Sequence, residues 1–177
     1  MKLREQKGFT LIEVIVVAGI IAILAGILVP LIFKEIDESK ISRASADVKS
    51  ISTAMLVFKK DTGQWPITST CAATTTMLMG AGTLPTLTGA GWNSGVVDVF
   101  ENYLSQDDNG CWPTTWKGPY MAFVNADPWG RSYIINADSL LTATSPIWLL
   151  SAGPDGIIDT ATTNSTPVGD DIGTRLR

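Results

Sequence analysis

Hydrophobic side chains follow two different patterns in the first third of the chain. Residues 14–33 carry no charge, and a helix of that length spans about 30 Å, the thickness of a bilayer's hydrocarbon core. Further along, apolar residues recur every three or four positions, as in a helix with one buried face; they are Ile41, Ala44, Val48, Ile51, Met55 and Phe58. The two patterns predict one long helix, apolar over residues 9–33 and amphipathic over residues 34–60, which ends before Gly63 and Pro66.

The rest of the chain, residues 61–177, shows the shorter signals of a small head domain. It begins with a long variable connection, residues 62–111, whose first part up to residue 97 is uncharged. A short second helix is predicted over residues 97–104, and three short strands between Pro/Gly turns follow; they are Tyr120–Val124, Ser132–Asn136 and Ile147–Leu150. We therefore predict an α+β fold in which the amphipathic half of the long helix packs on a small antiparallel β-sheet.

Composition argues against several classes of function. The 177 residues include no histidine and two cysteines, and the net charge is −4. Without histidine the chain lacks the commonest general base and a usual zinc ligand, so we predict that it is not an enzyme. The negative charge argues against nucleic acid as a partner, because nucleic-acid binders carry a basic surface. The aspartates remain candidates for binding a cation.

Two features of the N-terminus concern the membrane. Residues 1–8 contain three basic side chains against one acid, and the positive-inside rule then predicts a cytoplasmic N-terminus with the head exported. Glu13 is an acid at the start of the apolar helix, where a charge costs about 3 kcal/mol on insertion scales. Either Glu13 has a function in the membrane, or it reaches the headgroups from the helix end.

The two cysteines, Cys71 and Cys111, are predicted to form one disulfide, because paired cysteines are typical of exported domains. The bond would close a long loop, and the chain-entropy model gives such a closure about 4 kcal/mol of stabilisation. Two free thiols in an anaerobic host are the alternative.

The stretch KGFTLIEV, residues 7–14, resembles the cleavage signal of type IV pilins and of the pseudopilins of type II secretion. The resemblance implies that a dedicated peptidase cuts between Gly8 and Phe9, removing the leader peptide, and that the new N-terminus is methylated. Glu13 then becomes the fifth mature residue, the position this family reserves for glutamate. Its carboxylate would neutralise the Phe9 amine of a neighbouring subunit during assembly. The Phe9 amine of its own chain, one helical turn away, is the alternative partner.

The C-terminal loop, residues 151–173, contains four aspartates and no lysine or arginine; the aspartates are Asp155, Asp159, Asp170 and Asp171. Composition alone leaves two interpretations open. Calcium favours carboxylate and carbonyl oxygens in flexible loops, whereas a solvated acidic loop needs no cation.

Together with DTGQWP and DPWGRSY, the stretch SAGPDG…DDIG resembles the head of the major pseudopilins of type II secretion. That resemblance implies calcium as a cofactor, held by three carboxylates and two carbonyls, namely those of Asp155, Asp170, Asp171, Ala152 and Ile157. Asp159 is a further candidate ligand. Two segments depart from the family's pattern, because residues 158–169 are longer than expected and residues 62–109 do not match the compact connection.

The resemblance as a whole implies a pilin-like structural subunit that polymerises into a helical filament, closest to the major pseudopilin of type II secretion. The implied partners are other copies of the chain, minor pilins or pseudopilins, the prepilin peptidase and the assembly platform of the bacterial inner membrane. The chain would wait in that membrane and then enter a periplasmic or extracellular filament. The alternatives are a type IV pilin of surface fibres, for adhesion, motility or DNA uptake, and a monomeric membrane-anchored module that binds in a calcium-dependent way.

Overall fold

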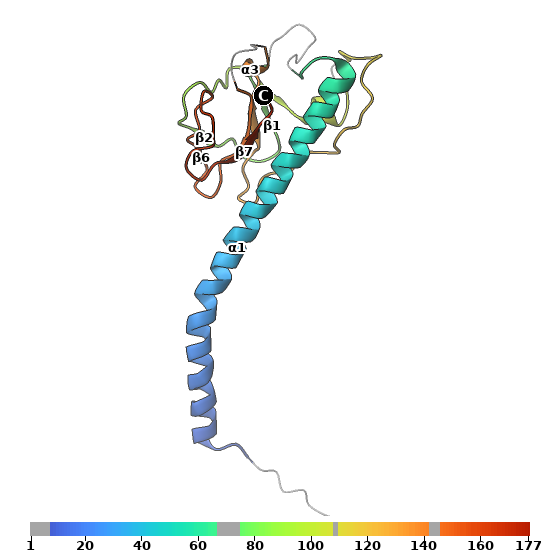
Figure 1. Ribbon diagram of the computed structural model, residues 1–177. Helices are drawn as coiled ribbons and strands as arrows, with labels where there is room; N and C mark the ends of the chain where they lie inside the picture. Colours follow the sequence, from blue (N-terminus) through green and yellow to red (C-terminus); the bar gives the residue numbers. More distant parts are fainter. Residues whose placement is uncertain (1–7, 67–74, 108–109, 142–145) are drawn as a thin grey trace, which may run out of the picture. The chain divides into compact units, whose positions relative to one another are not determined.

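The computed structural model describes residues 8–66, 75–107, 110–141 and 146–177 (Figure 1). The chain divides into two compact units, Met1–Ser39 and Lys40–Arg177. The predicted disulfide involves Cys71, which lies outside the described residues, as does most of the leader peptide.

One helix, α1 (Leu11–Thr62), covers both predicted halves of the long helix. Its N-terminal part is exposed at every position from residue 11 to residue 33, and it is long and apolar enough to cross a membrane. The helix ends where predicted, because Gly63 adopts a φ of 75° and its N–H bonds to the Lys59 carbonyl at 2.9 Å, an αL arrangement that glycine adopts readily.

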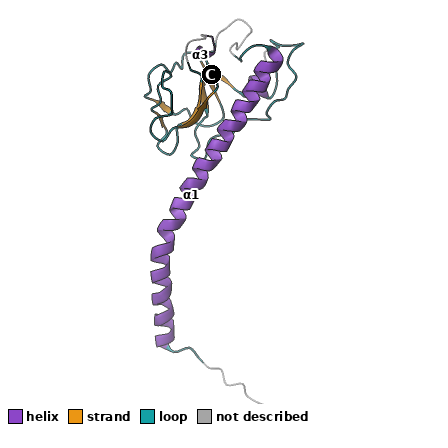
Figure 2. Ribbon diagram, viewed as in Figure 1, coloured by secondary structure: helices purple, strands orange, loops and turns teal. Residues whose placement is uncertain are grey.

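Figure 2 draws the strands of the second unit in orange. Five of them form the main sheet, in the order β3 (Val97–Val99), β1 (Met77–Met79), β4 (Ile134–Asn136), β5 (Trp148–Ser151) and β7 (Ile172–Arg175). The last four strands pair antiparallel, and β3 runs parallel to β1. The predicted α+β class is therefore confirmed, but the sheet is mixed and not purely antiparallel.

Smaller elements complete the second unit. Strands β2 (Thr86–Leu87) and β6 (Ile157–Ile158) form a separate parallel pair. The helices α2 (Glu101–Leu104) and α3 (Asp138–Leu141) are single turns. The helix predicted over residues 97–104 is thus correct only in its second half, since residues 97–99 pair with β1 as β3.

The core lies on both faces of the sheet. On one face Leu78, Ile135 and Leu149 stand side by side across three strands and pack with the buried side of α1. On the other face Ile134 and Leu150 belong to a second cluster that includes Ile158. Successive strand residues point to opposite faces, so both faces of this sheet need cover.

The buried side of α1 differs from the predicted one at two positions. Ala54 joins the core, whereas Ile41 is 43% exposed; the predicted burial of Ile41 was wrong because the packed part of the helix begins at Ala44. Phe58 contributes most to this face, with its ring set edge-on to Trp112 at 5.0 Å and to Tyr120 at 5.6 Å, a favourable geometry for aromatic pairs.

The strand predicted at Tyr120–Val124 is absent, and these residues form an irregular segment. Their backbone N–H groups bond to the α2 region instead of to a strand. Tyr120 and Met121 donate to the Leu104 carbonyl, and Val124 donates to the Glu101 carboxylate at 2.9 Å. The other two predicted strands correspond to β4, which begins two residues later than predicted and ends at the predicted residue, and to β5, which is shifted by one residue.

Candidate functional site

The start of α1 holds the predicted assembly residue in a defined arrangement. The Glu13 carboxylate accepts bonds from the Thr10 N–H and from the Thr10 hydroxyl, each at 2.7 Å, and the Glu13 N–H donates to the same hydroxyl at 3.3 Å. This reciprocal pattern is a capping box, which satisfies otherwise unpaired donors at a helix start. The stretch TLIE, residues 10–13, contains the sequence signal of a capping box, which was not among the predictions from the sequence.

Gly8 and Phe9 lie directly before this helix start, and the Phe9 side chain is 90% exposed. A cut between them would leave a short N-terminus on the first turn, near the Glu13 carboxylate. The proposed pairing of Glu13 with a Phe9 amine stays a prediction, because the chain described here is uncut at Gly8. Before cleavage Thr10 already supplies hydrogen bonds to the carboxylate.

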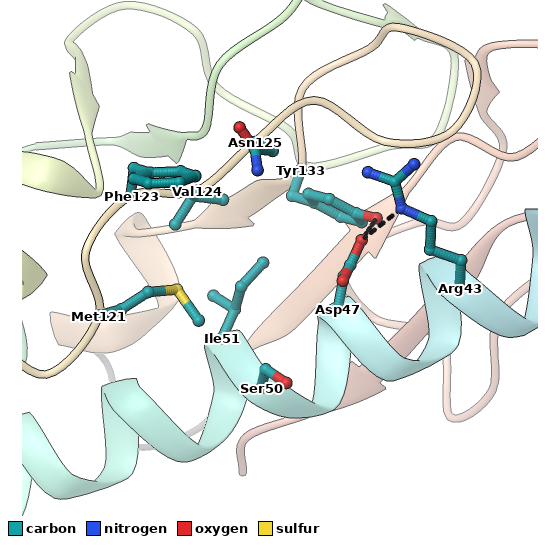
Figure 3. A pocket seen from close by; sticks show the side chains of 9 residues that line it. All are labelled: Arg43, Asp47, Ser50, Ile51, Met121, Phe123, Val124, Asn125 and Tyr133. Carbon is teal, nitrogen blue, oxygen red and sulfur yellow. Dashed lines mark hydrogen bonds and ion pairs between the residues drawn. The ribbon is translucent and has the colours of Figure 1, made fainter.

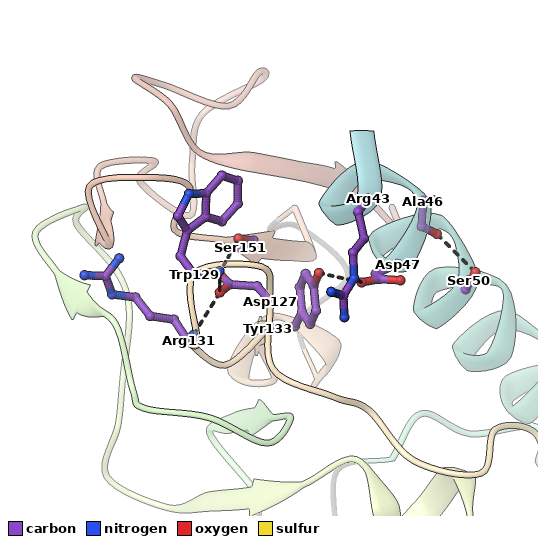
Figure 4. A network of polar contacts seen from close by, with 9 residues as sticks. All are labelled: Arg43, Ala46, Asp47, Ser50, Asp127, Trp129, Arg131, Tyr133 and Ser151. Carbon is purple, nitrogen blue, oxygen red and sulfur yellow. Dashed lines mark hydrogen bonds and ion pairs between the residues drawn. The ribbon is translucent and has the colours of Figure 1, made fainter. Parts of the chain in front are cut away.

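Asp127 is the centre of the polar network under the Asp-Pro-Trp-Gly turn (Figure 4). One of its oxygens accepts bonds from the backbone N–H groups of Trp129 and Arg131, at 3.0 and 2.8 Å, and the other accepts from the Ser151 hydroxyl at 2.7 Å. Asp127 is 4% exposed. Its carboxylate therefore ties the turn to strand β5, next to the start of the acidic loop.

A groove lies between α1 and the segment 121–125, lined by charged residues at one end and apolar residues at the other (Figure 3). The buried Tyr133 donates its hydroxyl proton to the Asp47 carboxylate at 3.0 Å, and Arg43 lies 3.7 Å from the same carboxylate. Burial raises the pKa of the Tyr133 phenol well above its ordinary value, and the Asp47 bond adds to the effect. Phe123 is 61% exposed beside it.

The structure sorts the four loop aspartates into two pairs. The Asp155 N–H donates to the Asp170 carboxylate at 3.0 Å, and the Asp159 N–H donates to the Asp171 carboxylate at 3.0 Å. The second pair is the more buried one. Burial raises the pKa of the Asp171 carboxyl above its ordinary value, while bonds from Thr160 lower it and the Asp159 charge raises it.

The fit of this loop to a cation is partial. Among the described residues no three acidic or cysteine side chains gather closely enough to form a ready metal site. One carboxylate oxygen, Oδ1 of Asp171, nevertheless has no hydrogen-bond partner in the described part of the chain, although Asp171 is 8% exposed. A buried carboxylate oxygen without a hydrogen-bond donor costs free energy of folding, and a bound cation would offset that cost. Ala152 is buried and Ile157 is half-buried beside these aspartates in sequence.

The predicted disulfide is not tested by the described residues. Cys111 is half-buried and packs against the main core cluster, and the pairing with Cys71 stays a prediction.

Comparison with known proteins agrees with this geometry. Residues 3–29 match the family described as the prokaryotic N-terminal methylation motif, and residues 100–168 match type II secretion system protein G. The chain is 29% identical over 157 residues to the type II secretion system core protein G of Pseudomonas aeruginosa, covering 88% of this chain and 89% of the relative. It is 30% identical over 156 residues to the core protein G of Escherichia coli, covering 88% and 87%.

A more distant relative is the toxin coregulated pilin of Vibrio cholerae, 32% identical over 75 residues, which cover 42% of this chain and 34% of that pilin. No solved structure matches this chain. The methylation signal, the exposed apolar helix and the small mixed sheet define a pilin-like protein. Within that class, the chain belongs to the type II secretion system core protein G family.

Proposed function

We propose that this chain is the major pseudopilin of a type II secretion system, the structural subunit of the helical filament that drives protein export. The observation that carries the proposal is the similarity to core protein G relatives over 88% of the chain. The proposal requires no catalysis by this chain.

The exposed apolar helix supports polymerisation as the mechanism. Every side chain of residues 11–33 is exposed in the single chain, and so large an apolar surface needs cover from lipid or from neighbouring subunits. The subunit would wait in the bacterial inner membrane with its N-terminus in the cytoplasm. The prepilin peptidase would then cut after Gly8, and the assembly platform would pack the freed helices, with minor pseudopilins, into a filament.

A knockout tests this function. A strain that lacks this chain should lose type II secretion, and overexpression should produce filaments that contain it and begin at N-methyl-Phe9 by mass spectrometry. Filaments whose subunits still begin at Met1 would contradict the cleavage.

The similarity to the toxin coregulated pilin makes a type IV pilin the second candidate. Normal secretion by the knockout, together with a loss of long surface fibres, would favour that candidate.

We further propose that the acidic loop binds one calcium ion. The unpartnered Asp171 oxygen supports this proposal, and so does the contact that brings the Asp155 N–H to the Asp170 carboxylate. These three side chains would hold the ion, with the carbonyls of Ala152 and Ile157 as additional ligands, and Asp159 is the alternative carboxylate. Bound calcium would draw these carboxylates together and balance their charge.

Calcium should raise the melting temperature of the soluble head, residues 40–177, which contains its own core. A site that binds only the folded state adds about 2.7 kcal/mol at a hundredfold excess of ligand over Kd. Asp155→Asn should abolish the difference in melting temperature between calcium and chelator, because it removes a charge from the site. The head should still fold, since the asparagine oxygen can accept the Ile157 N–H as the aspartate does. Magnesium should substitute poorly, since it demands a tighter octahedron. Superimposable melting curves with calcium and chelator would contradict the site.

A further inference from the structure

The two segments that depart from the family's pattern lie against each other. Strand β2, from the long connection, pairs with β6, at the start of the longer C-terminal loop (Figure 1). The contact continues beyond the strands, because Thr88 and Gly89 both donate N–H bonds to the Ile158 carbonyl and Thr162 donates to the Ala90 carbonyl at 2.9 Å. Backbone hydrogen bonds therefore join residues 86–90 to residues 156–162 of the loop.

Side chains of the same segment add to the contact. The Thr88 hydroxyl donates to the Asp159 carboxylate at 2.6 Å, and the Trp92 indole N–H donates to the Thr160 carbonyl at 2.8 Å. Leu87 and Trp92 also pack on the cluster that covers the second face of the sheet. The segment thus joins the loop to the head's own core.

Two glycines permit the close approach. A Cβ atom on Gly89 would lie 2.4 Å from the Thr160 carbonyl oxygen, and one on Gly91 would lie 2.1 Å from the Thr162 hydroxyl. Real Cβ atoms essentially never approach other heavy atoms so closely, and Gly91 has a φ of 88°, which other residues rarely adopt. The fit between the two segments is tight at these points.

We propose that residues 86–92 form a strap that positions residues 157–162 of the acidic loop through protein contacts, so that this half of the loop stays ordered without a cation. In the described part of the chain no hydrogen bond joins Asp170 or Asp171 to residues 86–92, and this other half of the loop depends on calcium. The second statement rests on the proposed calcium site, whereas the first does not.

Amide hydrogen exchange on the full chain in detergent micelles, followed by NMR, separates the two statements. In chelator, the strap amides of Thr88, Gly89 and Thr162 should exchange at least ~100-fold more slowly than free amides, and calcium should change them little. The Asp155 amide bonds to the Asp170 carboxylate and the Asp171 amide bonds to the Val168 carbonyl, so calcium should slow their exchange at least ~10-fold.

Each result has a defined meaning. Strap amides that exchange as fast as free amides in chelator would overturn the strap. Exchange at Asp155 and Asp171 that calcium leaves unchanged would contradict the calcium site but leave the strap supported, provided that the strap amides stay protected.

Variants test the strap itself. Gly89→Ala should speed exchange at Thr88 and Thr162 by ~10-fold or more, because its Cβ meets the Thr160 backbone. Gly95→Ala is the matched control, since its Cβ would meet only the Asn93 side chain. Unchanged exchange in β4 and β5 shows that the fold persists. If Gly89→Ala fails to fold, Trp92→Phe decides, because phenylalanine keeps an aromatic ring in place of the indole and removes the bond to Thr160. Exchange at Thr162 that ignores Trp92→Phe and Gly89→Ala would overturn the proposal.

Discussion

Replacement of Glu13 by alanine is expected to abolish filament assembly while the chain remains inserted in the membrane. Cleavage after Gly8 would place an α-amine one helical turn before Glu13. Packing the apolar helices together would bury that amine, and a buried charge without a partner costs several kcal/mol. The alanine variant would leave every amine in the filament unpaired. A membrane-inserted monomer can keep its N-terminus at the headgroups, so its stability should change little.

Filament yield by electron microscopy and membrane content by immunoblotting measure these two outcomes. Glu13→Gln is the matched control for the helix cap, because its amide oxygen still accepts from the Thr10 N–H and hydroxyl but carries no charge. Assembly should fail in Glu13→Gln as in Glu13→Ala. Thr10→Val keeps the carboxylate and should retain assembly at reduced yield. Normal filaments from Glu13→Ala would refute the pairing and favour a carboxylate that only reaches the headgroups.

Replacement of Asp127 by alanine is expected to destabilise the head by about 3 kcal/mol, because three donors lose their acceptor in a buried site. That change corresponds to a fall in Tm of about 10 °C for a domain of this size. The donors are the N–H groups of Trp129 and Arg131 and the Ser151 hydroxyl. Since the turn then loses its tie to β5, the acidic loop should also exchange faster.

Thermal unfolding of residues 40–177 in chelator measures this effect without a contribution from calcium. Asp127→Asn is the control, because its amide oxygen can still accept from the two backbone N–H groups and its amide nitrogen can donate to Ser151. Its loss should be about 1 kcal/mol. Equal melting temperatures for the alanine variant and the unchanged head would mean that the network adds no net stability.

Part of the candidate site was readable from the sequence because it depends on local order. The cleavage signal, Glu13 and the membrane-length helix are contiguous in the chain, and the periodicity of residues 41–58 identified the buried helix face except at Ile41 and Ala54. The capping box of Thr10 and Glu13 was readable in the same way, since its partners are three residues apart. The match to the methylation motif over residues 3–29 confirms the resemblance of this region to that family, while the cleavage after Gly8 and the role of Glu13 stay predictions.

Other features required the tertiary structure, because their partners are distant in the chain. Asp127 and Ser151 are 24 residues apart, and Thr88 and Asp159 are 71 residues apart. Strands of two residues, such as β2 and β6, show no measurable alternation. The parallel pairing of β3 with β1 could not be predicted either, because a segment as short as Val97–Val99 fits both a strand and a helical turn.

The sequence by itself determined the superfamily, the membrane-length helix with its acid at the start, and the α+β class. These properties follow from hydrophobic period, length and a contiguous motif, all of which act between near neighbours. Only the tertiary structure decided that the sheet is mixed, that Ile41 stays outside the core, and that the loop aspartates form two pairs. It also brought residues 86–92 against residues 157–162. Those outcomes depend on hydrogen bonds and contacts between residues that are distant in the chain. Such pairs form only when the whole head domain packs, so local sequence patterns do not predict them.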